Sequence, residues 1–568
     1  MACNDNLKQA RTSIPTTKLD ATQLLALTTL ATSRQEASFS LPSQRHDLKG
    51  STAYVEPTPP DSATSKDESE DKNAQSSLEL VLAYADQISE KILRGGLQDI
   101  HASREALRVL IDYMDQTVLA SRNIHTVVAS SPVSDSQKSK LLRSYYEALH
   151  AADVNTRPQE SGLFGTACST TKVAPTIYTV FGGQGLRSDC VQELGDIITT
   201  YPSLTKDLIH DAATMVANLS STDTTVSQLF PKGLDILAWL HDPAQVPDST
   251  YLASAPVSAP LIGLVQLAHY EVTCKTLGLT PGQFRSRIAG TTGHSQGIIT
   301  AAATAVADDW PSWREVTRAA ITTLFWIGVR TQQAWNALQC NTAVSEAMVQ
   351  DSIDHGERAP SPMLSVRGLT REDLQTCIDA TNRYLKHGGR YLAITMTNGP
   401  RHFVVSGPPK YLYGLNLQIR KAKQLLVQQK KADDHGKADV VGSRFLDVSV
   451  PFHTNWLDEA IPSIQDDVKD IRLPSSAMAI PVFSTEDGRD TGSEAGEANV
   501  LHRLVELVVR RSVDWDKATD ALATHTVLDF GPGGVHGIGS LSSSARVILA
   551  GTLSGRKAGV GYKGDLFL

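Results

Sequence analysis

The sequence predicts an α/β protein with a hydrolase-like, largely parallel sheet at its core, an inserted ferredoxin-like subdomain, and a small helical region ahead of both. Three short apolar runs indicate the core, because each enters a glycine cluster: residues 177–181, 287–292 and 526–530. Helical stretches separate these strand–glycine units, which is typical of a parallel sheet. We expect the active groups to gather where these strands end.

A different order of expected strands and helices predicts the inserted subdomain. Four expected strands and two expected helices follow in the order β-α-β-β-α-β, which is that of a ferredoxin-like fold. The strands are 363–366, 392–396, 402–406 and 444–450, and the helices are 371–384 and 410–423. The basic and polar stretch 421–437 is expected to form an exposed loop.

Four segments follow from these patterns. Residues 1–77 are expected to be a poorly ordered segment and linker, because proline, serine and charged residues dominate their second half. Residues 78–170 are expected to form the helical domain. The α/β core comprises 171–361 and 451–568, and the subdomain between them is 362–450.

Apolar residues within the helical domain recur at three- and four-residue steps, as on one face of a helix. The expected faces are Leu80, Ala83, Tyr84 and Ile88; Leu107, Leu110, Ile111 and Met114; and Leu141, Leu142, Tyr145, Tyr146 and Leu149. No chemistry is visible in this domain.

Composition restricts the class of protein. The 568 residues are 41% hydrophobic and 20% charged, as in an ordinary soluble protein, and the net charge of −8 gives no reason to expect nucleic acid binding. Six scattered cysteines show no metal-like spacing. No signal peptide and no membrane span are expected. We therefore expect a cytoplasmic enzyme with no bound metal or cofactor.

The central motif is the pentapeptide Gly293-His-Ser-Gln-Gly297, between an expected strand and an alanine-rich helix. A strand that turns sharply into a helix strains its central residue, and glycines on both sides remove the side chains that would collide. Ser295 would then be exposed near amides at a helix N-terminus, as a nucleophile requires. The alternative is a tight glycine turn with a capping serine.

Two further segments accompany this turn. Gly182-Gly-Gln-Gly185 follows the first strand but lacks the spacing and the lysine of phosphate-binding loops, so we expect it to approach another site closely. His453 follows the last subdomain strand and Pro451, where a general base would be placed. His269, in a run that is apolar nearly all round, is expected to be a core histidine.

Four pieces in order resemble the acyltransferase family that includes malonyl-CoA:acyl carrier protein transacylases. They are Phe181-Gly-Gly-Gln-Gly185, Gly293-His-Ser-Gln-Gly297, Pro451-Phe-His453 and Asp529-Phe-Gly-Pro-Gly533. Ala289-Gly-Thr-Thr-Gly-His-Ser-Gln-Gly297 and Thr323-Leu-Phe-Trp-Ile-Gly328 resemble more narrowly the N-terminal acetyltransferase domain of the fungal fatty acid synthase β subunit. The resemblance covers residue 78 to the end.

The resemblance implies a site of two catalytic residues. Ser295 would take an acyl group from coenzyme A as an ester, and His453, oriented by a backbone carbonyl of a late loop, would accept the serine proton. The backbone amides of Gln184 and Gln296 would form the oxyanion hole. Asn398 matches a family asparagine that lines the substrate pocket.

Acyl specificity is also implied by the resemblance. Malonyl-selective members carry an arginine on the helix after the serine, which pairs with the free carboxylate. That position falls on Ile327, so a malonyl carboxylate would be buried without a partner. We therefore expect acetyl or a longer neutral acyl group. Arg330, about a turn away, is the residue that would overturn this expectation.

Three functions remain open from the sequence. The first is transfer from a coenzyme A thioester to an acyl carrier protein, with a fatty acid synthase α-type subunit or a polyketide synthase as possible partners. The second is hydrolysis of acyl thioesters by the same serine and histidine, and the third is a non-catalytic scaffold. The chain lacks the later domains of the synthase β subunit, so it is either a fragment or free-standing.

Overall fold

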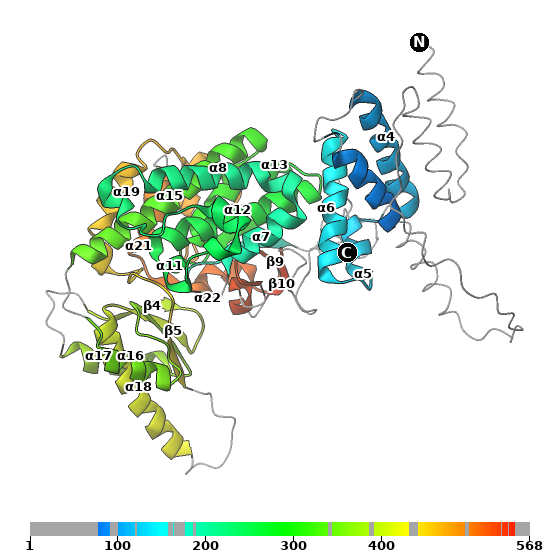
Figure 1. Cartoon of the computed structure of the whole chain (residues 1–568). Helices are drawn as coiled ribbons and strands as arrows, with labels where there is room; N and C mark the ends of the chain where they lie inside the picture. The colour runs from blue at the N-terminus through cyan, green and yellow to red at the C-terminus, as the bar shows by residue number, and fades with distance from the viewer. Residues whose placement is uncertain are drawn as a thin grey trace, which may run out of the picture. The chain divides into compact units, whose positions relative to one another are not determined.

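The computed structural model describes residues 78–90, 92, 100–119, 122–156, 163, 176–185, 189–338, 343–384, 391–430, 441–494, 499–534, 537–542 and 545–550 (Figure 1). The chain forms two compact units, Met1–Thr156 and Arg157–Leu568. The predicted N-terminal segment 1–77 lies outside the described residues. Residue 170, the predicted end of the helical domain, lies outside them too.

The described part of the first unit is helical. Residues 78–90 form a helix, and the elements that follow are α4 (Ile100–Tyr113), a π-helical turn (Met114–Val118), α5 (Ile124–Ser130) and α6 (Asp135–Ala151). A capping box begins α6, in which the Ser134 side chain accepts from the Gln137 backbone N–H and the Gln137 side chain accepts from the Ser134 backbone N–H. The buried faces predicted for the second and third helices are confirmed.

The face predicted for the first helix is wrong in part. Tyr84 and Ile88 are buried, but the Leu80 side chain is 44% exposed and Ala83 is also exposed. Burial falls on Leu78, Val81, Leu82, Ala85 and Ile88. The predicted face and the buried face both have helical spacing, so the sequence pattern alone does not decide which of them packs against the core.

A five-stranded parallel sheet forms the core of the second unit, in the order β10-β9-β1-β2-β7. The strands are β1 (Ile177–Phe181), β2 (Gly290–Gly293), β7 (Val482–Phe483), β9 (Thr526–Asp529) and β10 (Arg546–Leu549). In the register of β1 and β2, Phe181 lies opposite Gly293. The two strands that precede the glycine loops therefore end side by side, and the predicted fold class is confirmed.

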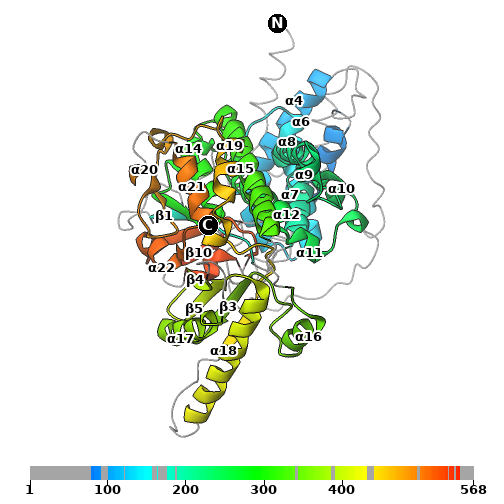
Figure 2. The same ribbon diagram turned by 90° about the vertical axis from the view of Figure 1, so that its left-hand side faces the viewer.

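Helices flank this sheet (Figure 2). They are α7 (Cys190–Thr200), α8 (Pro202–Ser220), α9 (Thr224–Ser227), α10 (Ile236–His241), α11 (Ser249–Leu252), α12 (Ala255–Thr276), α13 (Pro281–Arg285), α14 (Gly297–Val306), α15 (Trp310–Ala337), α19 (Ala460–Asp467), α20 (Thr491–Glu494), α21 (Val500–Val509) and α22 (Trp515–Ala518). Among the described residues, none of the helices has the length and apolar character needed to span a bilayer.

Helices α12 and α15 pack closely because glycines lie at their contact. A Cβ atom at Gly263 would lie 2.3 Å from Leu324 Cδ1, and one at Gly328 would lie 2.4 Å from the Ala255 carbonyl oxygen. Nearly every residue of α12 is buried, as predicted for its run 261–270, which is apolar nearly all round.

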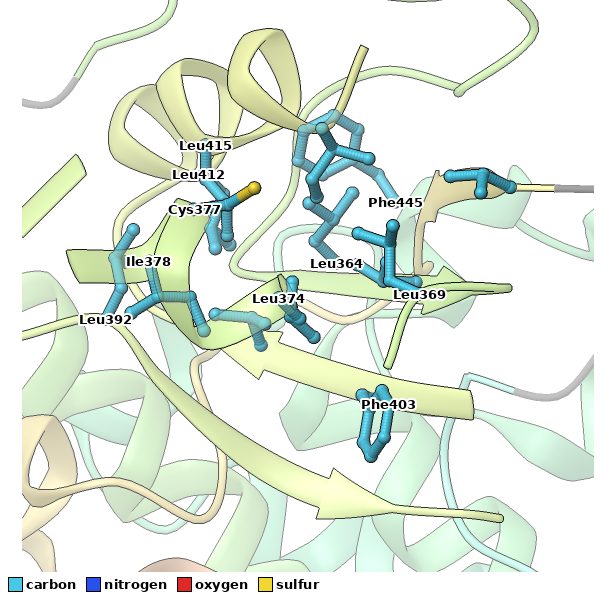
Figure 3. Packing of buried hydrophobic residues seen from close by; sticks show 14 residues of the cluster. Leu364, Leu369, Leu374, Cys377, Ile378, Leu392, Phe403, Leu412, Leu415 and Phe445 are labelled. Carbon is cyan, nitrogen blue, oxygen red and sulfur yellow. The ribbon is translucent and has the colours of Figure 1, made fainter. Parts of the chain in front are cut away.

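The second sheet has the order β6-β3-β5-β4-β8, and its first four strands have the ferredoxin-like arrangement. They are β3 (Met363–Arg367), β4 (Ala393–Thr397), β5 (His402–Ser406) and β6 (Gly442–Phe445), with α16 (Glu346–Asp354) before them and α17 (Arg371–Asn382) and α18 (Pro409–Lys430) between them. The last two helices and the sheet enclose an apolar core that includes Leu364, Phe403 and Leu412 (Figure 3).

Three features of this subdomain differ from the sequence prediction. Its fifth strand, β8 (Val513–Asp514), comes from the last part of the chain and runs parallel to β4. Strand β6 ends at Phe445, so 446–450 is not strand and His453 follows an irregular segment. Helix α18 continues to Lys430, so the first part of the predicted loop 421–437 is helical. The rest of that loop, 431–437, lies outside the described residues.

Candidate active site

The serine turn joins the end of β2 to the start of α14. Ser295 has a φ of 55°, in the left-handed region that L-residues rarely adopt. A Cβ atom at Gly293 would lie 2.0 Å from the Gly297 carbonyl carbon, and one at Gly297 would lie 2.4 Å from the Phe181 carbonyl oxygen. Glycine is therefore required on both sides of the serine, and the bend has the geometry of a nucleophile elbow.

Ser295 contacts His453 directly. The distance from Ser295 Oγ to His453 Nε2 is 2.7 Å, although the residues are 158 positions apart. His453 Nδ1 lies 2.7 Å from the backbone carbonyl oxygen of Arg511. Since a carbonyl oxygen only accepts, Nδ1 carries the proton and Nε2 offers its lone pair to the serine hydroxyl. A backbone carbonyl in place of a carboxylate thus completes the arrangement.

Burial keeps this histidine neutral. His453 is 3% exposed, and desolvation lowers its pKa to about 4. The Arg511 carbonyl acts in the opposite direction, and the nearby His294 lowers the pKa further. At neutral pH the imidazole is therefore unprotonated and able to accept a proton.

The backbone N–H groups of Gln184 and Gln296 point to an oxyanion site. Among the described residues, neither group has a hydrogen-bond acceptor. Their side chains are held elsewhere: Gln184 Nε2 donates to Ser258 Oγ at 2.7 Å, and Gln296 Nε2 donates to the Ala259 carbonyl at 3.0 Å. Any role in binding an oxyanion therefore falls on the two backbone amides.

Gly183 brings the first of these amides close to the serine. A Cβ atom there would lie 2.7 Å from the His294 carbonyl oxygen and 3.0 Å from Ser295 Cβ. Both neighbours are parts of the strained turn, so the 182–185 loop would have to move away from it.

Gly183→Ala is therefore expected to lower the rate of Ser295 acylation about 10- to 100-fold, because a displaced oxyanion donor stabilises less charge. The check is a single-turnover rate with an acyl-coenzyme A, beside the control Gly195→Ala. Gly195 lies on α7, where an added Cβ atom has no neighbour closer than 4.0 Å. A wild-type rate in Gly183→Ala would contradict the close-approach requirement.

His294 and Asn398 form a second pair beside the turn. Asn398 Oδ1 lies 2.9 Å from His294 Nε2, and the Trp515 ring meets the His294 ring edge-on with centroids 5.2 Å apart. Burial lowers the pKa of His294, so this imidazole is neutral and donates through Nε2. Asn398, predicted to line the substrate pocket, thus links the β4–β5 loop to the residue before the serine.

The two positions that the resemblance links to acyl specificity lie on α15. Ile327 is completely buried. Arg330 makes a two-point ion pair with Asp467, with Nε–Oδ2 at 2.7 Å and Nη2–Oδ1 at 2.9 Å, and its Nη1 donates to Gln333. The Asp467 contact raises the pKa of Arg330. Arg330, the residue that would overturn the expected acyl specificity, is therefore already paired within the protein.

The structure thus brings together Ser295, His453 and the amides of Gln184 and Gln296, while Ile327 is a core residue of α15. Sequence reasoning missed Trp515, for which no motif gave a signal. The core assignment of His269 agrees with its burial and its 2.7 Å contact with Glu193. Within the described residues, no group of three His, Cys, Asp or Glu side chains is placed to hold a metal ion.

This arrangement can attack a carbonyl carbon, hold the resulting oxyanion and return a proton to a leaving group. Residues 179–436 match the family model described as "Starter unit:ACP transacylase in aflatoxin biosynthesis".

The curated relatives are fungal synthase subunits. The chain is 40% identical to fatty acid synthase beta subunit TOXC of Cochliobolus carbonum over 87% of its length, and 41% identical to fatty acid synthase subunit beta of Saccharomyces cerevisiae over 69%. It is 35% identical to fatty acid synthase beta subunit aflB of Emericella nidulans over 84% of its length. It spans 24%, 19% and 22% of these three relatives, respectively.

Solved structures with a similar fold are bacterial transacylases. Malonyl-CoA:acyl carrier protein transacylase from Xanthomonas oryzae pv. oryzae is 18% identical with a TM-score of 0.45, and the match covers 70% of this chain and 98% of that one. The Coxiella burnetii enzyme is 17% identical with a TM-score of 0.43, covering 67% and 95%.

Proposed function

We propose that the chain moves an acyl group from coenzyme A to the thiol of an acyl carrier protein through an ester on Ser295, and the match of residues 179–436 to the starter unit:ACP transacylase family model supports this proposal. The observation that carries the proposal is the series of contacts from Ser295 Oγ to His453 Nε2 and from His453 Nδ1 to the Arg511 carbonyl. Each contact is 2.7 Å long, and the pair lies beside two amides that have no acceptor among the described residues.

In the first half-reaction, Ser295 Oγ attacks the thioester carbonyl while His453 Nε2 takes the hydroxyl proton. The Gln184 and Gln296 amides donate to the oxygen that becomes negative. The tetrahedral intermediate then expels the coenzyme A thiolate, which recovers the proton from His453. An acyl ester on Ser295 remains.

The second half-reaction reverses these steps with a different thiol. His453 removes the proton from the carrier thiol, whose sulfur attacks the ester carbonyl. The carbon–oxygen bond to Ser295 breaks, and His453 returns the proton to Oγ. The same neutral histidine serves both halves, which agrees with its buried position and lowered pKa.

We propose that the acyl group is acetyl or a longer neutral chain. Ile327 supplies no charge, and Arg330 is engaged by Asp467 and Gln333. A malonyl carboxylate buried there would lack a partner, which costs about 3–5 kcal/mol.

Ile327→Arg is expected to raise the ratio of malonyl to acetyl loading about tenfold, because the new guanidinium would pair with the malonyl carboxylate. Competition between the two coenzyme A thioesters, read as adduct mass, gives the ratio. Ile327→Met, which is similar in size and uncharged, is the matched control. An unchanged ratio in a folded Ile327→Arg protein would show that this position does not face the acyl group.

We place the reaction in fatty acid or polyketide biosynthesis in the cytoplasm, with a carrier belonging to a synthase α-type subunit or a polyketide synthase. The similarity to relatives that are fatty acid synthase β subunits supports this proposal. A test mixes the full chain, an acyl-coenzyme A panel and a phosphopantetheinylated carrier protein. Acyl-carrier product that depends on Ser295 is expected, whereas release of free acid alone would make the protein a thioester hydrolase.

A further inference from the structure

One buried side chain connects three segments around the serine. Gln266 lies on α12 and has no exposed surface. Its Nε2 donates to the Gly182 carbonyl at 2.8 Å and to the Gly531 carbonyl at 2.9 Å. Its Oε1 accepts from Thr300 Oγ1 at 2.7 Å. Both amide hydrogens and the amide oxygen are therefore used, as buried polar groups require.

Each partner belongs to a segment that builds the site. Gly182 is the residue before Gly183-Gln184, so its carbonyl lies one peptide away from the loop that approaches the serine. Thr300 lies on the first turns of α14, directly after the serine turn. Gly531 follows β9, and its carbonyl also accepts from the Gly182 backbone N–H at 2.9 Å. Helix α14 packs against both α12 and β1.

The hydroxyl of Thr300 fixes the orientation of the amide. Because Oγ1 donates to Oε1, the NH₂ end of Gln266 must face the two glycine carbonyls. A flipped amide would place its oxygen against two carbonyl oxygens. One hydroxyl on the nucleophile helix therefore sets the direction of the donors that hold the glycine loops.

The Gly531 loop has further anchors. Asp529 Oδ1 accepts from the Gly531 N–H at 2.8 Å, and Glu193 Oε2 accepts from the Gly533 N–H at 3.3 Å. Glu193 in turn contacts His269, which lies one turn after Gln266 on α12. These hydrogen bonds fix the position of the Gly531 loop. The Gly182 N–H donates directly to the Gly531 carbonyl of this loop, and the Gly182 carbonyl accepts from Gln266 Nε2.

We propose that Gln266 is a positioning residue: its amide holds the Gly182–Gln184 loop at the distance from Ser295 at which the Gln184 N–H meets the oxyanion. The inference rests on the proposed serine mechanism. Gln266 does not touch the reacting atoms, and it acts only through the backbone of the loop. Its loss should therefore slow the chemical step and leave substrate binding nearly unchanged.

The test uses Gln266→Met, which keeps the length of the side chain and removes every hydrogen bond. A fluorophosphonate probe measures the reactivity of Ser295 independently of the natural substrate. The Ser295 oxygen displaces fluoride and forms a phosphonyl ester, and the phosphonyl oxygen of this ester occupies the oxyanion position. Single-turnover acylation by acetyl-coenzyme A, the Kd of that thioester and Tm are measured on the same full-length proteins.

Gln266→Met is expected to lower the rate constants for phosphonylation and acylation about 10- to 100-fold, because a partly displaced oxyanion donor loses part of its effect. The Kd should change less than about twofold. Thr300→Val should give a smaller loss of rate, and Thr300→Ser, which keeps the hydroxyl, should recover most of it. Gln192→Met, on the exposed face of α7, controls for the substitution itself.

Wild-type rates in folded Gln266→Met would overturn the inference, and so would a raised Kd with an unchanged rate constant. If Gln266→Met does not fold, equal rates in Thr300→Val and Thr300→Ser would overturn it equally well. Failure of the proposed function gives a different result. No thioester would then acylate the wild type, while the phosphonylation rates of the wild type and Gln266→Met could still be compared.

Discussion

Ser295→Ala is expected to abolish the acyl-enzyme and to lower acyl transfer by at least about 10⁴-fold, because no other nucleophile occupies the turn. The backbone of Ser295, with its φ of 55°, presents the Oγ atom 2.7 Å from His453 Nε2. Alanine removes only that oxygen atom. The backbone of the turn should persist, since both flanking glycines remain.

Intact-protein mass spectrometry after mixing with acyl-coenzyme A checks this result, and peptide mapping locates the adduct. Ser286→Ala is the matched control, because Ser286 is exposed and its hydroxyl only donates to the Gln283 carbonyl. An adduct of undiminished amount in Ser295→Ala would remove the serine mechanism outright.

His453→Gln is expected to lower acylation by about 10²- to 10⁴-fold while leaving the Kd for the thioester close to that of the wild type. Glutamine retains polar character but cannot take the serine proton at neutral pH. Measuring the single-turnover rate and the Kd separately distinguishes loss of the base from loss of the pocket. A rate within threefold of the wild type would mean that another group removes the proton.

The lowered pKa of His453 also predicts how the acylation rate of the wild type varies with pH. A base with a pKa of about 4 is already unprotonated at pH 5.5, so the wild-type acylation rate should be nearly constant from pH 5.5 to 7.5. A tenfold rise over that range would place the pKa near the ordinary value for histidine, 6.5.

The lowered pKa of His453 also determines whether the free energy of unfolding rises or falls with pH. The unfolded chain takes up the proton at about pH 6.5 and the folded chain only at about pH 4, so the free energy of unfolding should decrease as the pH falls from 6.5 towards 4. His402, whose pKa burial also lowers to about 4, contributes in the same direction.

Local geometry explains why part of the site could be predicted from the sequence. A serine between glycines in a strand-to-helix bend has few conformations available, so Ser295 and its elbow follow from five residues. His453 could be chosen among sixteen histidines only through its resemblance to a family motif. The strand–glycine units likewise predicted the parallel core, since their short apolar runs need helices on both faces.

The rest depends on contacts between distant residues, which no local pattern encodes. The carbonyl that orients His453 belongs to Arg511, and the partner of Arg330 is Asp467 on another helix. Gln266 gave only a weak signal as the one amide in an apolar helical run. Strand β8 joins the second sheet through two residues, too few to show a period.

The most direct test of the central claim is the fate of an isolated acyl-enzyme. The full chain is loaded from acetyl-coenzyme A and separated from free thioester. It is then divided between buffer and a phosphopantetheinylated carrier protein. Transfer predicts an adduct on Ser295 that persists in buffer and disappears as acetyl-carrier forms at a matching rate. An adduct that decays equally fast in buffer and releases acetate would contradict the transferase function.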